Sequence, residues 1–228
     1  MAAIYLIRHG QASFGTSNYD QLSPQGLLQA TALGNSLRER GIQFDAVFAG
    51  SMQRHAQTAQ NCLTAMDCQL QPEIVPGFNE YDHEEVFARH VPELQSKAEL
   101  NQYLARFPNP HKTFQIEFEK AVRRWRSGEF DSDYSESWQH FRQRCLDALD
   151  VVRNCRAKSI AVFSSGGPIG TITGHVLGVQ DDHSVELTWA IMNCSITSLL
   201  FNQEKISLRY FNDFAHFDNG EKALLTHR

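Results

Sequence analysis

Three short polar segments contain residue types that bind anions and react with them. Residues 8–11 read RHGQ, Arg54 lies in the segment SMQRHAQT, and residues 164–167 read SSGG. Two arginines, here Arg8 and Arg54, can hold a phosphoryl group through forked hydrogen bonds and balance its charge during transfer. The imidazole of His9 is a nucleophile at neutral pH and needs no strong base to deprotonate it. These residue types predict phosphoryl-group chemistry with His9 as the nucleophile.

Each of the three segments follows a run that predicts a buried strand. The runs are AIYLI at 3–7, DAVFA at 45–49 and SIAVF at 159–163, all short and apolar. They alternate with predicted helices, which indicates an α/β three-layer sandwich with a mainly parallel central sheet flanked by helices. Ligands bind such sheets at the carboxyl ends of the strands. We therefore expect the three polar segments to meet at one edge of the sheet.

Capping residues predict where the first two helices begin. Ser23 is an expected N-cap with proline in the first turn, and Gly41 is expected to end that helix. The apolar face of this helix is expected to include Leu27, Leu28, Thr31 and Leu37. Ser51 is expected to cap a second helix, which places Arg54 in its first turn. Free N–H groups and the helix dipole favour an anion at that position.

The remaining segments are predicted to complete a single domain over residues 1–228 with one insertion. Residues 83–134 are polar, aromatic and helical in pattern, which predicts a helical cap inserted into the sandwich. The other expected elements are a strand at 69–75, a long amphipathic helix at 135–155, a helix ending at 177, and paired strands at 195–201 and 206–211.

Several motifs then occur in an order that a known family shares. RHG follows the first strand, LSPQG begins the next helix, and S-x-x-R-x-x-Q-T-A follows the second strand. A GGPIG turn and the segment NCSIT at 193–197 come later in the chain. With this ordered set the chain resembles the histidine phosphatase superfamily, also called the phosphoglycerate-mutase-like family, over most of its length outside the insertion.

The resemblance implies a covalent mechanism and a role for each motif residue. His9 would attack phosphorus and form a phosphohistidine, which water would then hydrolyse. Arg8 and Arg54 would bind the phosphoryl oxygens, and Gln11 would line the same pocket. Such a mechanism needs no metal ion and no organic cofactor, so neither is expected. The partner would be a small-molecule phosphate ester.

A leaving group that departs as an alkoxide needs a proton donor. Glu80, in the segment PGFNEYD, stands where the family usually carries its acid, with Phe78 in place of the usual leucine. A carboxyl group beside Phe78 and Tyr81 and close to a dianion is suited to donate a proton. Glu84 and Glu85 are alternatives, because the glycine that commonly follows in the family is absent.

The chain departs from the family's pattern at Ser165. Relatives usually read S-H-G-G where residues 164–167 read SSGG, so serine stands in place of the second histidine. Serine can donate a hydrogen bond to a phosphoryl oxygen but brings no positive charge, and losing one good donor costs about 10²- to 10³-fold in rate. Ser165 is still expected to line the phosphoryl pocket. His83, His183 and His216 are candidates for the missing imidazole.

The leading hypothesis is a phosphatase that hydrolyses a phosphate monoester of a small or medium metabolite, with the cap selecting the substrate. A pseudoenzyme that binds a phosphorylated ligand through Arg8 and Arg54 without turnover is one alternative. A phosphoglycerate-mutase-type phosphotransferase ranks lower. A serine hydrolase built on Ser164 or Ser165 is remote, because the G-x-S-x-G elbow is absent.

Composition argues against several other classes. A net charge of -5 and a pI of about 6.0 provide no uniformly basic face for nucleic acid. The five cysteines contain no CxxC pair, which argues against a zinc site or a disulfide framework and favours a reducing, cytoplasmic location. The apolar run at 2–7 is too short for a signal peptide or a membrane span. The run RRWR at 123–126 is interpreted as a solvated helix face with one packed tryptophan.

Overall fold

The computed structural model describes residues 2–13, 20–92, 97–218 and 222–227. The chain divides into two compact units by its internal contacts. The first unit comprises Met1–Glu80 and Arg144–Arg228, and the second comprises Tyr81–Gln143. In sequence, the second unit therefore separates the two parts of the first.

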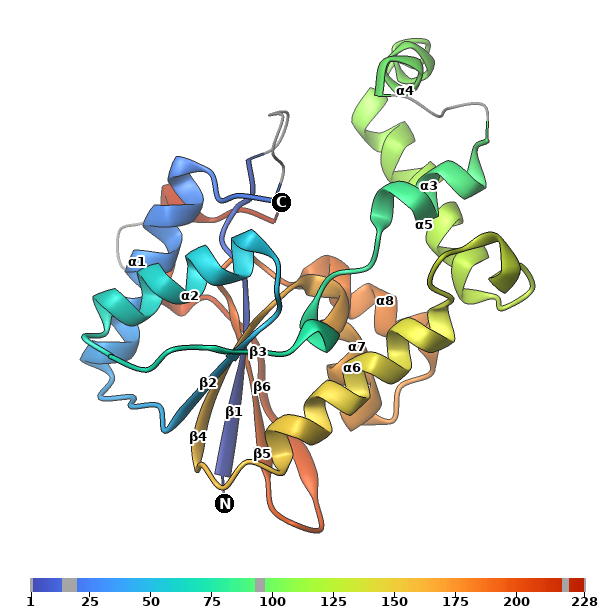
Figure 1. Cartoon of the computed structure of the whole chain (residues 1–228). Coiled ribbons are helices and arrows are strands. Elements are labelled where there is room, and N and C mark those ends of the chain that lie inside the picture. The colour runs from blue at the N-terminus through green and yellow to red at the C-terminus, as the bar shows by residue number, and fades with distance from the viewer. Residues whose placement is uncertain (1, 14–19, 93–96, 219–221, 228) are drawn as a thin grey trace. The chain divides into compact units, whose positions relative to one another are not determined.

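A six-stranded mixed sheet forms the centre of the first unit (Figure 1). The strand order is β3-β2-β4-β1-β5-β6, in which β3, β2, β4 and β1 pair in parallel and β5 and β6 add antiparallel pairs. The predicted α/β architecture with a mainly parallel sheet is confirmed. The strands span Ala2–Arg8 (β1), Ala46–Ala49 (β2), Glu73–Ile74 (β3), Ser159–Ser164 (β4), Ile196–Phe201 (β5) and Ile206–Asp213 (β6).

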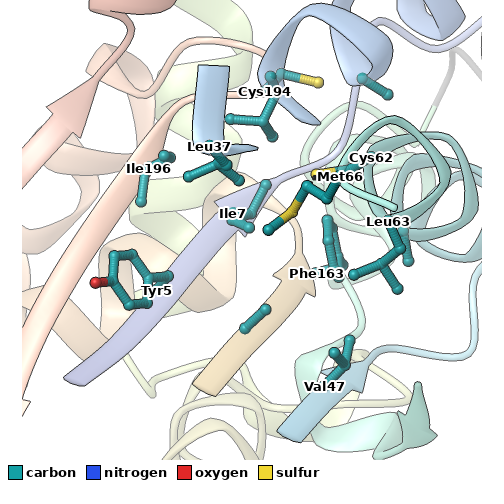
Figure 2. Packing of buried hydrophobic residues seen from close by; sticks show 14 of the residues in the cluster. Tyr5, Ile7, Leu37, Val47, Cys62, Leu63, Met66, Phe163, Cys194 and Ile196 are labelled. Carbon is teal, nitrogen blue, oxygen red and sulfur yellow. Dashed lines mark hydrogen bonds between the residues drawn. The ribbon is translucent and has the colours of Figure 1, made fainter. Parts of the chain in front are cut away.

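The central strand β1 is buried on both faces. Successive side chains of a strand point to opposite faces, so Ile4 and Leu6 lie on one side and Tyr5 and Ile7 on the other. All four are buried, which explains why the run AIYLI is apolar throughout rather than alternating. Figure 2 shows part of one core cluster, in which the labelled residues are Tyr5, Ile7, Leu37, Val47, Cys62, Leu63, Met66, Phe163, Cys194 and Ile196.

Helices flank the sheet of the first unit on both faces (Figure 1). Helix α1 (Pro24–Glu39) packs against α2 (Gln53–Ala65), and both contribute side chains to the cluster of Figure 2. Helix α7 (Gly166–Leu177) packs against α8 (Asp181–Ala190) and contacts β1 and β6. Helix α6 spans Trp138–Arg153, and its residues from Arg144 onward also belong to this unit.

The predicted cap of α1 is confirmed, but its predicted apolar face is partly wrong. Ser23 accepts a hydrogen bond from the N–H of Gly26, and Pro24 is the first helical residue. Leu27 and Leu28 are 39% and 60% exposed, because they lie outside the stripe that faces the sheet. The residues that α1 buries, at helical spacing, are Gly26, Gln29, Ala30, Leu33, Gly34 and Leu37.

Ser51 does not cap α2, so that prediction is wrong. The N-cap is Met52, whose side chain makes no capping hydrogen bond. Ser51 binds Asn79 instead: its N–H donates to Oδ1 at 2.7 Å, and its Oγ accepts from Nδ2 at 2.8 Å. This pair ties the segment after β2 to the segment that carries Glu80.

The sequence pattern predicted the strands at one edge of the sheet more accurately than the strand at the other edge. β5 and β6 pair antiparallel as predicted, and their turn is closed by Asn202, whose N–H donates to the carbonyl of Lys205 at 2.9 Å. The strand predicted at 69–75 is shorter, since only Glu73–Ile74 pairs with β2. An edge strand has one neighbour and needs only a short stretch of pairing.

The second unit has an aromatic core of its own. The ring of Trp125 packs against those of Tyr81, Trp138 and Phe141 at centroid distances of 4.8, 5.3 and 5.5 Å. Trp138 and Phe141 belong to α6, so the unit extends past the 83–134 range suggested by composition. Its helices are α3 (His83–His90), α4 (Lys97–Leu104), α5 (Pro110–Arg126) and the first part of α6.

The run RRWR has a packing role within this second unit. Trp125 is buried and its Nε1 donates to the carbonyl of Glu136 at 2.8 Å. The guanidinium of Arg124 lies 3.9 Å from the ring centroid of Phe130 and donates to Tyr134 Oη at 2.7 Å. One packed tryptophan agrees with the prediction, and the contacts of Arg124 add an ordered cation on the aromatic surface.

Candidate active site

The carboxyl ends of β1, β4 and β2 lie side by side in the sheet. Arg8, the last residue of β1, is in parallel register with Ser164, the last residue of β4. Beyond the strands, the N–H of His9 donates to the carbonyl of Ser164 at 2.9 Å, and the N–H of Gly50 donates to that of Phe163 at 3.1 Å. The sheet thus gathers the three polar segments at one edge, as the sequence predicts.

His9 presents a neutral imidazole with a free nitrogen lone pair. The ring is buried, and Nδ1 lies 2.7 Å from the carbonyl oxygen of Gly10. A carbonyl only accepts hydrogen bonds, so Nδ1 carries the proton and Nε2 keeps its lone pair. Burial, followed by the positive charges of Arg54 and Arg8, holds the pKa of His9 well below its usual value. An uncharged imidazole of this kind is a competent nucleophile.

Glycine is required on both sides of the contact between the His9 loop and α1. A Cβ on Gly10 would lie 2.5 Å from the carbonyl oxygen of Gly26, and one on Gly26 would lie 2.2 Å from that of Gln11. Both distances are far below a normal contact with backbone. The N–H of Gly10 also donates to Thr58 Oγ1 on α2 at 3.0 Å. Close approach of the loop to two helices therefore fixes the backbone that carries His9.

Arg54 lies in the first turn of α2, as predicted, and its side chain is buried. Its guanidinium donates to Asp20 Oδ1 at 2.8 Å, and Oδ2 of the same carboxylate accepts from the N–H of Gln53 at 2.8 Å. A carboxylate therefore binds at the start of α2, where the helix dipole favours negative charge. Motif reasoning did not single out Asp20. Its position indicates that this helix end can hold an anionic group.

Arg8 reaches from the end of β1 towards the start of α7. Its guanidinium donates to the carbonyl of Ile191 and, at 2.8 Å, to the carbonyl of His227. A Cβ on Gly166 would lie 3.9 Å from Arg8 Nε, which places the guanidinium near the first residue of α7. Carbonyl groups from two distant segments thus orient this cation near Ser165.

Gln11 lies at the junction between the His9 loop and α1. Its side-chain Oε1 accepts from Ser23 Oγ at 2.8 Å, and its N–H donates to Gln29 Oε1 at 2.7 Å. These bonds fix the loop on the helix that Ser23 caps. A phosphoryl-binding role for Gln11 stays a prediction.

Glu80 is positioned at the start of α7. Its Oε2 accepts a hydrogen bond from the N–H of Gly167 at 3.0 Å. The preceding segment is held by Arg144, which donates to the carbonyl of Gly77 at 3.1 Å and to that of Asn79 at 2.7 Å. The carboxyl group therefore shares a helix end with Ser165, and its role as an acid stays a prediction.

The alternative acids, Glu84 and Glu85, belong to the second unit. Glu85 accepts from the backbone N–H of Ser135 at 3.1 Å and also from its hydroxyl group. Its carboxylate thus orders the chain between α5 and α6. Glu80 is the acidic candidate that the first unit itself places beside the start of α7.

Ser165 is completely buried and pairs with a histidine that sequence reasoning missed. It is the N-cap of α7, yet its side chain makes no capping bond. Its Oγ lies 2.7 Å from Nε2 of His55, which is also completely buried. The ring centroid of His55 is 5.8 Å from that of His9. One signal in the sequence was available: position 55 falls on the stripe of α2 that is buried, which comprises Arg54, His55, Thr58, Ala59, Cys62 and Leu63.

The three histidines suggested as replacements belong to other elements. His83 begins α3 in the second unit, and His183 is exposed on α8. His216 is partly buried near Asp213 and Arg40, and this burial chiefly lowers its pKa to about 4. The imidazole that contacts Ser165 belongs to His55 on α2.

No group of three or more His, Cys, Asp or Glu side chains in residues 2–13, 20–92, 97–218 and 222–227 is arranged to hold a metal ion. Within these same ranges, every helix is too short or too polar to cross a bilayer.

The model of the histidine phosphatase superfamily (branch 1) matches residues 4–214. The chain belongs to this superfamily. RHG stands at the end of β1, and Arg54 lies in the first turn of α2.

Curated relatives match over part of the chain. A 2,3-bisphosphoglycerate-dependent phosphoglycerate mutase from Bartonella henselae is 31% identical over 102 residues, which cover 41% of this chain and 49% of the mutase. A mutase of the same name from Neisseria gonorrhoeae is 34% identical over 77 residues, covering 31% of this chain and 34% of that protein. The matched segments thus span half or less of these relatives.

Solved structures match over nearly the full length. A phosphoserine phosphatase mutant from Entamoeba histolytica, in complex with phosphoserine, has a TM-score of 0.65 and 19% identity, covering 95% of this chain and 99% of that one. A phosphoglycerate mutase from Bacillus anthracis has a TM-score of 0.66 and 16% identity, covering 96% of each chain. At these identities the likeness establishes the fold.

Proposed function

We propose that the protein is a phosphatase that hydrolyses a phosphate monoester of a small or medium metabolite through a phosphohistidine at His9. The observation that supports this most strongly is the state of His9: buried, with Nδ1 at the carbonyl of Gly10 and its pKa lowered by burial, Arg54 and Arg8. A neutral imidazole between two arginines suits attack on a dianionic phosphoryl group.

In the first step, Nε2 of His9 attacks phosphorus and forms a P–N bond while the bond to the ester oxygen breaks. The electron pair of that bond leaves with the oxygen, which takes a proton from an acid that we assign to Glu80. Arg8 and Arg54 balance the charge on the phosphoryl oxygens, with Gln11 as a further ligand. The hydrogen bond from Nδ1 to the carbonyl of Gly10 supports the positive charge that His9 acquires.

In the second step, water attacks the phosphohistidine. The P–N bond breaks, its electron pair returns to Nε2, and the carboxylate of Glu80 accepts the proton from water. His9 is then neutral again and inorganic phosphate leaves. Neither step requires a metal ion, an oxidant or a reductant.

Small phosphorylated metabolites are the substrate class that we propose. Neighbours of the same fold include a phosphatase crystallised with phosphoserine and a mycobacterial glucosyl-3-phosphoglycerate phosphatase, which has 16% identity to this chain and a TM-score of 0.62. Residues 81–143 are proposed to select among such esters, since they form a separate unit with its own aromatic core.

The test is hydrolysis of p-nitrophenyl phosphate between pH 4.5 and 8 in the presence of EDTA. Wild type is compared with His9→Ala and with His175→Ala, which removes an exposed histidine on α7. We expect metal-independent turnover in wild type and His175→Ala and its loss in His9→Ala. Unchanged activity in His9→Ala would contradict the mechanism.

The alternatives predict different results in the same series. A phosphoglycerate mutase, which the match to the Bartonella henselae protein favours, would interconvert phosphoglycerates instead of releasing phosphate. A pseudoenzyme would bind vanadate but form no phosphohistidine. Phosphate release from a panel of metabolite esters therefore separates the phosphatase from both.

A further inference from the structure

His55 and Ser165 form a buried polar contact beside the nucleophile. Both side chains are inaccessible to solvent, and the distance from His55 Nε2 to Ser165 Oγ is 2.7 Å. His55 comes from α2 and Ser165 from the start of α7, so the contact joins two of the three polar segments. Buried polar groups of this kind are expensive unless they are paired. His55 Nε2 and Ser165 Oγ satisfy each other.

The surrounding chain accommodates this contact at two positions. A Cβ on Gly50 would lie 2.3 Å from His55 Nδ1 and 2.6 Å from Asn79 Oδ1, so glycine after β2 makes room for the imidazole. Ser165 is the N-cap of α7 but gives no side-chain cap, although serine commonly caps through its hydroxyl. The hydroxyl is thus directed to His55 rather than to the helix.

We propose that His55 and Ser165 act as one unit that takes the place of the second active-site imidazole. In this arrangement His55 Nε2–H donates to Ser165 Oγ, and the Ser165 hydroxyl donates to an oxygen of the phosphoryl group that His9 attacks. Ser165, which is closed to solvent in the free protein, then meets the phosphoryl group when substrate enters, and His55 is a positioning residue that orients and polarises its hydroxyl. This inference rests on the proposed function.

The electrostatics of the free site set the charge of His55, while the direction of donation is part of the proposal. Burial and then the charge of Arg54 lower the pKa of His55 to about 3, so the imidazole is neutral before substrate binds. A neutral imidazole can place its single proton on Nε2 and donate it to Ser165. The hydroxyl is then left with one proton to give, and a dianionic phosphoryl group is the strongest acceptor that enters the site.

The opposite direction of donation would have a different chemical meaning. If Ser165 donated to His55, the pair would have the arrangement of a serine nucleophile with its base. The two arginines beside His9 favour binding of a phosphoryl group over attack on an uncharged ester. Labelling with a fluorophosphonate probe tests this alternative directly.

A double-mutant cycle tests the pair. The variants are His55→Ala, Ser165→Ala and the double variant, with Thr173→Val as control because Thr173 is another buried hydroxyl on α7, bonded to the carbonyl of Ile169. The readouts are kcat and KM for p-nitrophenyl phosphate, the calorimetric Kd of inorganic phosphate, and thermal unfolding. We expect each single variant to weaken phosphate binding and lower kcat/KM by about tenfold or more.

The double variant should lie within about threefold of the weaker single variant, because residues that act as a unit give non-additive losses. Thr173→Val should retain wild-type kinetics. A second double variant, His55→Ala with Ser165→His, controls for loss of packing, because it returns an imidazole to the vacated space. This double variant should recover about tenfold in kcat/KM over His55→Ala, whereas Ser165→His alone should not exceed wild type, since its ring would meet His55.

Additive losses, or wild-type phosphate binding in both single variants, would contradict the proposal that His55 and Ser165 act as one unit. Labelling of Ser165 by a fluorophosphonate in wild type but not in His55→Ala would also overturn it, since the hydroxyl would then be a nucleophile. If wild type bound phosphate but released none from any ester, the proposed function would fail. The Kd values for phosphate across the double-mutant cycle would then alone test whether His55 and Ser165 act as one unit. A wild-type protein that bound no phosphate would contradict both.

Discussion

Backbone groups orient the individual side chains at this site through hydrogen bonds. The carbonyl of Gly10 sets the tautomer of His9, and burial between Arg54 and Arg8 keeps its ring neutral. The N–H of Gly167 sets the position of the Glu80 carboxyl group at the start of α7. The proposed nucleophile and the proposed acid are thus each held by one backbone group, which is how a site holds its reacting atoms before substrate arrives.

The acid role of Glu80 predicts a dependence on the leaving group. Glu80→Gln keeps a side chain of similar shape but removes the proton donor. We expect a loss of about 10²- to 10⁴-fold in kcat for alkyl phosphates, whose alkoxide needs a proton as it departs. The loss should be far smaller for p-nitrophenyl phosphate, because p-nitrophenolate is a stable leaving group. Steady-state kinetics with both esters measure the difference.

Glu85→Gln is the matched control, since its carboxylate is bound to Ser135 in the second unit. It should leave the ratio of the two rates unchanged. Equal losses for the two esters in Glu80→Gln would show that the residue does not protonate the leaving group.

Motifs located most of the candidate residues but missed His55. Arg8, His9 and Arg54 stand in ordered patterns, and the structure brings their segments together at the edge of the sheet. His55 and its partner Ser165 are 110 residues apart, and neither lies in a spacing that predicts contact. Only the neighbouring positions of β2 and β4 in the sheet bring them together, and one sequence without structure does not reveal that.

At the scale of elements, the close contact between the His9 loop and α1 predicts that an added Cβ at Gly26 destabilises the protein. Gly26→Ala places a Cβ 2.2 Å from the carbonyl oxygen of Gln11, so the loop must move away from the helix. We expect a loss of about 1–3 kcal/mol in the free energy of unfolding, measured by urea denaturation. A fall in kcat should accompany it, because the displaced loop carries the carbonyl that orients His9.

Leu28→Ala provides the comparison on the exposed face of the same helix, where Leu28 is 60% exposed. It should change the free energy of unfolding by less than about 0.5 kcal/mol and leave kcat unaltered. A Gly26→Ala protein as stable and active as wild type would show that the close contact is not required.

Element types were predictable from sequence, whereas their ends and exposed faces were less so. The β1 run predicts a strand because its apolar character is continuous, and the pattern of Ser23 and Pro24 predicts a helix start. Ser51 has the same chemistry as Ser23, but Asn79 binds its hydroxyl and backbone N–H. A capping signal is local, and a partner from a distant segment overrides it.

Across the whole molecule, buried neutral histidines predict that stability depends on pH. Burial, above all, lowers the pKa of His55 to about 3 and that of His216 to about 4, while the unfolded chain binds protons near the usual value of 6.5. Between these values the unfolded state holds more protons than the folded state. The free energy of unfolding should therefore fall as pH is lowered from about 6.5, by up to about 1.4 kcal/mol per pH unit for each histidine.

His216→Gln isolates one of these contributions, since His216 lies in the short helical turn Ala215–Phe217. Its unfolding free energy should depend less steeply on pH between 6.5 and 4 than that of wild type, as measured by chemical denaturation. His175→Gln, at an exposed position on α7, should keep the wild-type slope. Identical slopes in all three proteins would contradict the neutral state of His216 in the folded protein.

The most direct test of the central claim is to trap the covalent intermediate on His9. Wild type and His9→Ala are mixed with p-nitrophenyl phosphate, quenched at alkaline pH where phosphohistidine survives, and examined by mass spectrometry of intact protein and peptides. The proposed mechanism predicts one added phosphoryl group in wild type, located on His9, lost in acid and absent from His9→Ala. Turnover without this adduct, or an adduct that persists in His9→Ala, would contradict it.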